Sequence, residues 1–188
     1  RLMSNIGKSV ISKRSVDNVH HCIDGIGGNG VIENTSSMPR LFRDVVILEN
    51  WEGTHNTLYM QVLRDIHRYQ HDQSYLRVMA KLIAKIDDLY RSEKQLATES
   101  IEKIDADIAD LHASSEALQS LKMAPLVSEM ANLFYYVSLI LEGAHQQRED
   151  VLDSKLRCAE LFYLTHINEK TSVHDDAYLA LCERVIEK

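Results

Sequence analysis

Two short stretches of the chain contain residue types that could bind an anion or move a proton. The first is the run Gly27-Gly28-Asn29-Gly30, which holds three of the seven glycines in the chain. Glycine backbone can take positive φ and approach another group with no Cβ in the way, so such a loop presents bare N–H groups that can cradle phosphate. The alternative is a glycine-rich helix terminus that binds nothing.

The second stretch is the run Trp51-Glu52-Gly53-Thr54-His55-Asn56. A carboxylate held close to a carbon acid can act as a general base, and Glu52 is the candidate for that role. Gly53 permits a tight turn after it, and Thr54 is a suitable N-cap for the apolar-periodic helix that follows. The alternative for Glu52 is a solvated glutamate near a helix start, and His55 is expected to be exposed.

Between these stretches lie Arg40, Arg43 and Asp44. The two arginines are three residues apart, so they share a face on one helical turn. They could bind anions, but a structural ion pair involving Asp44 is the preferred interpretation.

The order GGxG, then RxxRD, then an aromatic residue followed by EGT resembles the C-terminal domain of the acyl-CoA dehydrogenase family. These flavoenzymes place a double bond beside a thioester. The resemblance covers residues 1–70, little over a third of the chain, and leaves 71–188 as an appended acidic helical region. It implies an all-α helical bundle, FAD as cofactor and an acyl-CoA thioester as substrate.

The resemblance also implies roles for individual residues. Glu52 would take the α-proton as a hydride leaves the β-carbon for the flavin, while its backbone N–H helps to hold the thioester oxygen. The implied cofactor-binding residues are Asp24, Gly27, Gly28, Thr54 and Asn56. The glycine loop would meet FAD held mainly by a neighbouring subunit, which predicts a homodimer or homotetramer.

Three positions depart from the family pattern. Asp24 and Asn56 each stand where Gln is common, and Trp51 replaces Tyr or Phe. The WEG variant and the helical extension also resemble the alkylation-response branch, whose members keep the flavin. Two alternative hypotheses are therefore a flavin-binding protein that does not dehydrogenate and a helical module that mediates oligomerisation.

Charge and composition limit the partners. Residues 1–66 hold seven basic and seven acidic side chains, while 67–188 hold fourteen and twenty-one and carry the net charge of −7. An acidic helical tail is a poor binder of phosphate backbones, so nucleic acid is not an expected partner. The longest strongly apolar run, 133–141, is far short of the roughly 20 residues that cross a bilayer, so no membrane span is expected.

Cysteine and histidine usage predicts neither disulfides nor a metal site. The three cysteines form no CxxC pair, which fits buried free thiols in a reducing compartment such as the cytoplasm or, in a eukaryote, the mitochondrial matrix. His67 and His71 have the spacing of a metal pair on a helix, but no third ligand stands nearby. His20 and His21 are expected at the helix surface or in helix packing.

Apolar spacing predicts helices throughout and no β alternation. A stripe already under way at the first residues, with no cap before it, predicts that the chain is a fragment. The members of this stripe are Leu2, Ile6, Val10, Val16, Val19 and Ile23. The resemblance implies that this fragment lacks most of the flavin and acyl pocket and is inactive alone.

Two further stripes of apolar residues, or seams, are predicted to pack helices together. The first comprises Leu76, Met79, Ile83, Ile86 and Tyr90. The second comprises Ala97, Ile101, Ile104, Ile108, Leu111, Ser115 and Leu118. Pro125 predicts a break before a helix over 126–144, and two more helices are expected over 150–165 and 174–186.

Overall fold

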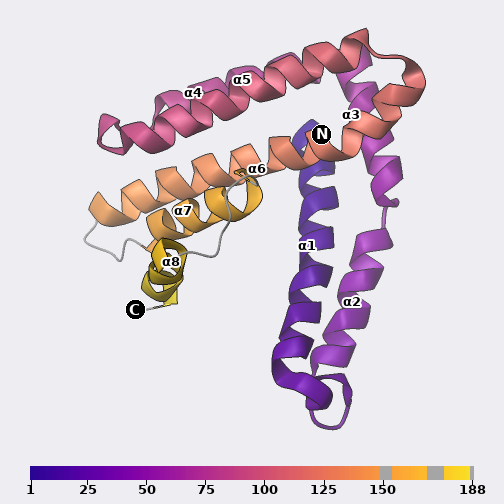
Figure 1. Cartoon of the computed structure of the whole chain (residues 1–188). Helices are drawn as coiled ribbons and strands as arrows, with labels where there is room; N and C mark the ends of the chain where they lie inside the picture. The colour runs from indigo at the N-terminus through magenta and orange to yellow at the C-terminus, as the bar shows by residue number, and fades with distance from the viewer. Residues whose placement is uncertain (149–153, 169–175, 187–188) are drawn as a thin grey trace. The chain divides into compact units, whose positions relative to one another are not determined.

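The structure is a computed structural model that describes residues 1–148, 154–168 and 176–186 (Figure 1). Within these ranges every regular element is helical and no strand occurs. The predicted all-α fold class is therefore confirmed.

The described residues form two compact units. The first comprises Arg1–His71 with Ser114–Ser128, and the second comprises Asp72–Ala113 with the described part of Glu129–Lys188. The long helix α6 (Glu116–Arg148) contributes its first part to one unit and its remainder to the other. A family boundary after residue 70 stays a prediction.

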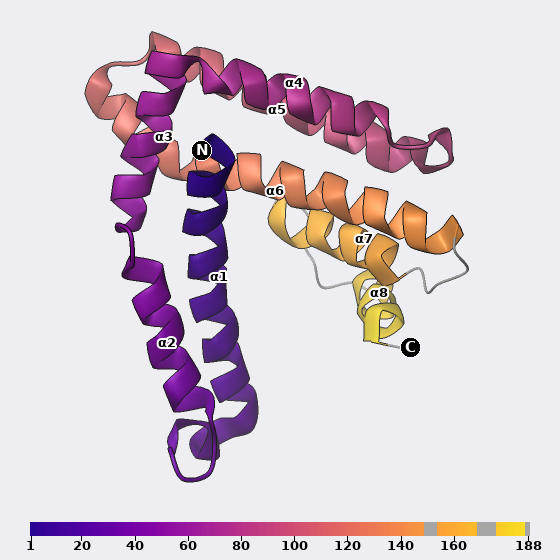
Figure 2. The same ribbon diagram turned by 180° about the vertical axis from the view of Figure 1, so that it is seen from behind.

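The first unit begins with a helical hairpin. Helix α1 (Leu2–Ile26) leads through the 3₁₀ turn η1 (Gly27–Val31) into α2 (Met38–Asn50), and α3 (His55–Tyr69) follows. Helix α1 packs against both α2 and α3, and Figures 1 and 2 show α1 and α2 side by side, joined by the η1 turn. The hairpin fixes the glycine run at one end of α2 and the Glu52 stretch at the other.

The core of this unit confirms the apolar stripe predicted for α1. Leu2, Ile6 and Val10 are buried, whereas the members of the stripe nearer the η1 turn are half-buried. No residue of α2 is buried. The other buried apolar side chains of the unit come from α3 and the start of α6: Leu58, Val62, Ile66, Met123, Leu126 and Val127.

One charge lies inside the first unit. Asp65 on α3 is fully buried, and guanidinium nitrogens of Arg1 and Arg64 lie 3.3 and 3.5 Å from its carboxylate. A buried carboxylate is costly unless it is paired, so the two arginines offset that cost.

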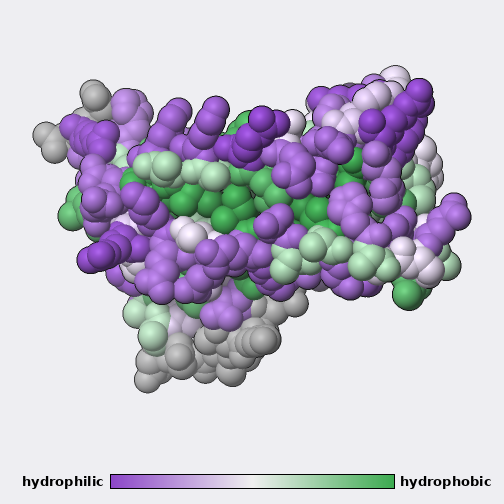
Figure 3. All heavy atoms as spheres, turned by 90° about the horizontal axis from the view of Figure 1, so that it is seen from above, coloured by the Kyte–Doolittle hydropathy of each residue, from purple (hydrophilic) through white to green (hydrophobic). Residues whose placement is uncertain are grey.

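The second unit is built from a second hairpin. Helix α4 (His71–Ala84) connects through the 3₁₀ turn η2 (Asp88–Tyr90) to α5 (Arg91–Ala113). Met79, Ile83 and Ile86 of the first predicted seam are buried, as are Ala97, Ile104, Ile108 and Leu111 of the second. Figure 3 shows the hydrophobic band that runs between hydrophilic rows over this hairpin. Both seams are thus confirmed along most of their length.

The end of the second predicted seam is wrong. Helix α5 stops at Ala113 and α6 starts at Glu116, so Ser115 and Leu118 do not continue it. Both residues are exposed, Leu118 to 49%. A heptad count cannot detect the two-residue helix break, because the apolar spacing continues across it.

The predicted helix break at Pro125 is also wrong, because Pro125 lies inside α6. Proline lacks the N–H that would bond to the carbonyl four residues earlier, at Leu121. Leu121 is 74% exposed and Pro125 is exposed, so water can satisfy that carbonyl. The helix therefore continues through the proline.

Because α6 is continuous, it holds a window long and apolar enough to cross a bilayer, and half of that window is buried within the protein. Core helices pass the same test, so this is weak evidence for a membrane span. The expected absence of a span stays a prediction.

The last helices follow the sequence-based expectation. Helix α7 (Ser154–His166) and α8 (Asp176–Ile186) match the two predicted segments, of which 150–153 and 174–175 lie outside the described residues. A Cβ on Gly143 would lie 2.7 Å from Leu156 Cγ, so glycine there permits the close approach of α7 to α6.

Buried polar groups also tie the second unit together. The Tyr75 hydroxyl donates to the Met130 carbonyl at 2.8 Å, and burial raises the pKa of Tyr75, which keeps that donor protonated.

The three cysteines are free, but the expectation that they are buried is wrong, because Cys22 is exposed and Cys158 and Cys182 are half-buried.

Candidate active site

The glycine run forms a turn that closes onto α1 and leaves part of its backbone open. Gly27 has φ 73°, and its N–H points to the carbonyl oxygens of Ile23 and Asp24. Gly30 is buried, and a Cβ there would lie 2.8 Å from the Ile23 carbonyl oxygen. Gly28 is exposed, with open space where its Cβ would be. Gly30 thus has a packing role, while Gly27, Gly28 and Asp24 are exposed.

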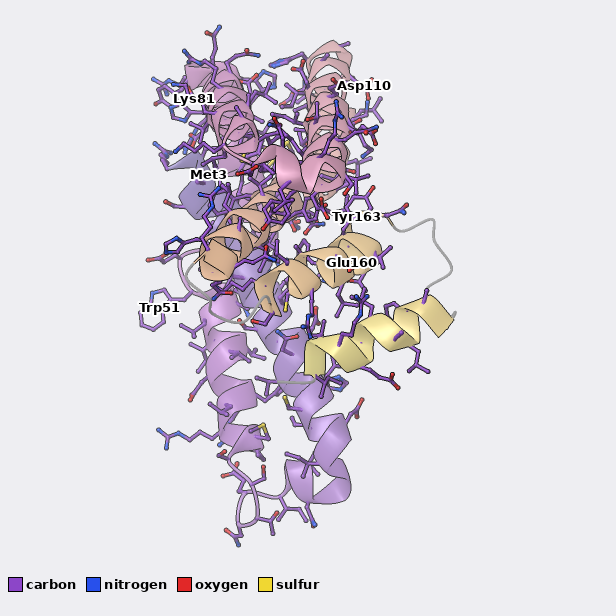
Figure 4. All side chains as sticks on the ribbon, turned by 90° about the vertical axis from the view of Figure 1, so that its left-hand side faces the viewer. Met3, Trp51, Lys81, Asp110, Glu160 and Tyr163 are labelled. Atoms are coloured by element: carbon purple, nitrogen blue, oxygen red, sulfur yellow. The ribbon has the colours of Figure 1, made fainter. Side chains whose placement is uncertain are left out.

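Glu52 lies in the turn between α2 and α3, in an unusual backbone conformation. Its φ is 66° and that of Gly53 is 124°. A left-handed non-glycine residue costs on the order of 1–2 kcal/mol, so the turn stores strain at Glu52. Glu52 is exposed, and Trp51, which is 64% exposed, projects away from the ribbon in Figure 4.

The start of α3 lies directly after this turn. Thr54 occupies the predicted N-cap position with extended backbone, but its hydroxyl does not cap the helix. It lies 3.3 Å from the Thr57 hydroxyl instead. The first N–H groups of α3 therefore lack a side-chain cap, and a helix N-terminus of this kind favours negatively charged or hydrogen-bond-accepting groups. Thr54 and Asn56 are both exposed at this end of the helix.

The expectation that His55 is exposed is wrong. The side chain retains 23% exposure, its Nε2 lies 3.5 Å from the Glu49 carboxylate, and its ring stacks on Tyr59 with centroids 6.3 Å apart. The charged neighbour of His55 is thus Glu49 on the last turn of α2.

Lys8 contacts the end of α2, directly before the Glu52 turn, and the sequence analysis did not identify it. Its ammonium donates to the carbonyls of Leu48 at 2.9 Å and Glu49 at 3.3 Å. These carbonyls belong to the last turn of α2, where positive charge is favoured. The lysine therefore anchors the end of the helix that leads into Glu52. No local signal could reveal it, because the partners are 40 and 41 positions apart.

The RxxRD segment contains the predicted ion pair and one that was not predicted. Arg40 lies 3.9 Å from Asp44, with both side chains largely exposed, so the pair contributes little to stability. Arg43 instead pairs with Glu33, which follows η1, and this interaction raises the pKa of Arg43. Arg43 thus links α2 to the segment after the glycine turn.

The predicted site residues fall into two clusters. Asp24, Gly27 and Gly28 lie before the start of α2, whereas Glu52, Thr54 and Asn56 lie after its end (Figures 1 and 2). Helix α2 has 13 residues and is therefore about 20 Å long. The structure does not bring the two clusters together within one chain.

These features define an all-α domain with an open glycine turn at one end of a helix and a strained glutamate at the other. Residues 2–67 match the model of the acyl-CoA dehydrogenase C-terminal domain. This part of the chain is therefore similar to the C-terminal domain of the acyl-CoA dehydrogenase family, as the motifs predicted.

Two curated relatives agree with this assignment. The chain is 28% identical over 124 residues to acyl-CoA dehydrogenase family member 11 of Caenorhabditis elegans, which covers 63% of this chain and 19% of the relative. It is 35% identical over 68 residues to the putative acyl-CoA dehydrogenase AidB of Escherichia coli (strain K12), which covers 36% of this chain and 12% of the relative. The chain thus spans less than a fifth of these relatives. No solved structure matches.

The alignment to the C. elegans protein is longer than the domain match, so it includes residues outside 2–67. Part of the sequence beyond the matched domain is therefore shared with that relative.

Proposed function

We propose that this chain is a C-terminal portion of an FAD-dependent acyl-CoA dehydrogenase and that Glu52 is its catalytic base. The observation that carries the proposal is the backbone of Glu52, held at φ 66° beside Gly53 at φ 124°. Strained non-glycine residues persist where the surrounding structure enforces them, and they cluster at functional sites. The family motif places a glutamate in this turn, which supports the same assignment.

In this proposal Glu52 acts through both its side chain and its backbone. The carboxylate removes the proton from the carbon alpha to the thioester. The Glu52 N–H helps to hold the thioester oxygen as negative charge develops on it. That N–H donates to no backbone carbonyl in the described part of the chain, so it is available for this role. When bound, FAD supplies the acceptor for the hydride that leaves the β-carbon.

The other exposed residues fit contacts to FAD at two separate points. Thr54 and Asn56 lie at the uncapped start of α3, where free N–H groups suit oxygen atoms of the cofactor. At Gly27 and Gly28, no protein atom lies close to the position that a Cβ would occupy. Because α2 separates these points by about 20 Å, we assign the glycine turn with Asp24 to the cofactor of a neighbouring subunit.

This arrangement requires a homodimer or homotetramer, and it uses an acyl-CoA thioester as substrate. The three free cysteines suit a reducing compartment, so we place the enzyme in the cytoplasm or, in a eukaryote, the mitochondrial matrix.

The test is Glu52→Gln in the complete enzyme that carries this chain. The substitution keeps side-chain size and the backbone N–H but removes the base. FAD should still bind, while anaerobic reduction of the flavin by acyl-CoA should slow by roughly 10²–10⁴-fold. Glu49→Gln is the matched control, because Glu49 lies in the preceding helix beside His55, and it should leave reduction nearly unchanged. Near-normal reduction by the Glu52 variant would place the base elsewhere.

A flavin-binding protein that does not dehydrogenate is the second candidate. It is motivated by Asp24 and Asn56, which depart from the pattern of the family. The unsubstituted enzyme decides between the two candidates: bleaching of the flavin band by acyl-CoAs of increasing chain length would identify a dehydrogenase or oxidase. A flavin band that persists with every thioester would favour the second candidate.

A further inference from the structure

Three metal-ligating side chains lie together at the exposed end of α1. The ligand atoms of His20, His21 and Asp24 all lie within 4.8 Å of one another, and all three residues are exposed. We propose that this cluster binds one divalent transition-metal ion, with Zn²⁺ as the reference ion. The proposal does not depend on the dehydrogenase activity proposed above, but it shares Asp24 with the contact assigned there to a neighbouring subunit's cofactor, so the carboxylate serves one ligand or the other.

The helix itself brings the three ligands together. Successive residues of an α-helix are about 100° apart, so Asp24 lies about 40° round the helix from His20 and about 60° from His21. The carboxylate therefore lies between the two imidazoles, roughly one turn further along α1. The rings of His20 and His21 are adjacent, with centroids 6.3 Å apart.

The donor set suits a late first-row metal. Two imidazole nitrogens and one carboxylate oxygen are ligands that Zn²⁺ accepts at about 2.0–2.2 Å, and exposure leaves room for water in the remaining position. Ligand atoms around a tetrahedral ion are about 3.4 Å apart at these bond lengths. Small rotations of exposed side chains therefore convert the observed grouping into a coordinating one.

The surroundings favour a cation at this place. The cluster occupies the C-terminal turns of a 25-residue helix whose last turn contains no basic residue. The free carbonyls at a helix C-terminus carry partial negative charge, which attracts cations. The His20 ring also lies beside Phe42 of α2, with centroids 6.5 Å apart.

His67 and His71 are a second candidate metal-binding pair in the same chain, because a spacing of four residues is typical of two metal ligands on one helix. Helix α3 ends at Tyr69, Gln70 is left-handed with φ 51°, and α4 starts at His71. The two histidines therefore do not share one helix, and they are not grouped with a third ligand among the described residues. The structure thus favours the cluster on α1 over the pair that the sequence spacing suggested.

The experiment is calorimetric titration of ZnCl₂ into the whole chain with its three cysteines replaced by serine, so that thiols cannot bind the ion. One Zn²⁺ per chain is expected. Separate His21→Asn and Asp24→Asn variants should each weaken binding at least tenfold, and His67→Asn should not change it. Circular dichroism checks that each variant keeps its helices. Affinity should also fall in acid, because imidazole binds metal only when neutral.

Two results would overturn the proposal. One is the absence of one-to-one binding at millimolar Zn²⁺. The other is equal binding by the parent, His21→Asn and Asp24→Asn chains, which would mean that the ion binds non-specifically to surface histidines.

Discussion

At the residue scale, the glycines of the η1 turn differ in what they contribute. Gly30 is buried against the backbone of Ile23, whereas Gly28 faces open space and has no positive φ. Sequence reasoning treated the run as one motif, because a motif does not reveal which Cβ would collide. The difference between the two glycines can be tested directly.

Gly30→Ala should lower the free energy of unfolding by about 1–3 kcal/mol, because its new Cβ would meet a backbone oxygen that cannot easily move. Gly28→Ala should change it by less than about 1 kcal/mol. Urea denaturation followed by circular dichroism measures both. Equal losses would show that the turn does not have the described packing. If the complete protein binds FAD as proposed, weaker FAD binding by the Gly28 variant would identify a contact role separate from folding.

At the element scale, the two prolines of the chain occupy opposite kinds of position. Pro39 lies in the first turn of α2, where its fixed φ suits the helix and no N–H is needed. Pro125 lies inside α6, where it removes a helical hydrogen bond. The sequence-based interpretation gave Pro125 the role that Pro39 has.

Pro125→Ala should therefore raise the free energy of unfolding by about 1–2 kcal/mol, since an interior helical proline costs about 3 kcal/mol relative to alanine and part of this is offset in the unfolded chain. Pro39→Ala is the matched control and should give no gain. Thermal unfolding compares the two variants at one protein concentration. A helix that truly ended before residue 125 would respond to Pro125→Ala no more than to the control.

At the scale of the whole molecule, α6 is shared by two compact units. Met123 and Met130 are both fully buried on this helix, but Met123 belongs to the first unit and Met130 to the second. The same substitution at the two sites can therefore report on the division of the chain.

Each Met→Ala substitution should cost about 2–5 kcal/mol within its own unit, because it leaves a cavity in a packed core. Hydrogen exchange followed by mass spectrometry should show reduced protection in α1 and α3 for Met123→Ala, and in α4 and α5 for Met130→Ala. The same pattern of lost protection from both variants would mean that the chain unfolds as one unit.

The candidate site was proposed from the sequence because its signals are local. The glycine run, Glu52 and Thr54 were identified from residue type and short spacing, and the domain match covers them. Local spacing did not reveal the contact of Lys8 with the end of α2, the pairing of His55 with Glu49 or the positive φ of Glu52. These depend on partners in other elements or on how the chain turns between helices.

The sequence by itself determined the helical class, the resemblance of residues 2–67 to a known domain and most of the buried faces, because apolar residues at helical spacing and ordered motifs can be read within a few turns of chain. Only the tertiary structure decided that α6 passes through Pro125 and that the two predicted site clusters lie at opposite ends of α2. It also placed the side chains of His20, His21 and Asp24 together, whereas His67 and His71 lie on different helices. Helix ends and the exposure of a carbonyl or side chain depend on packing across the fold, so local propensity alone cannot set them.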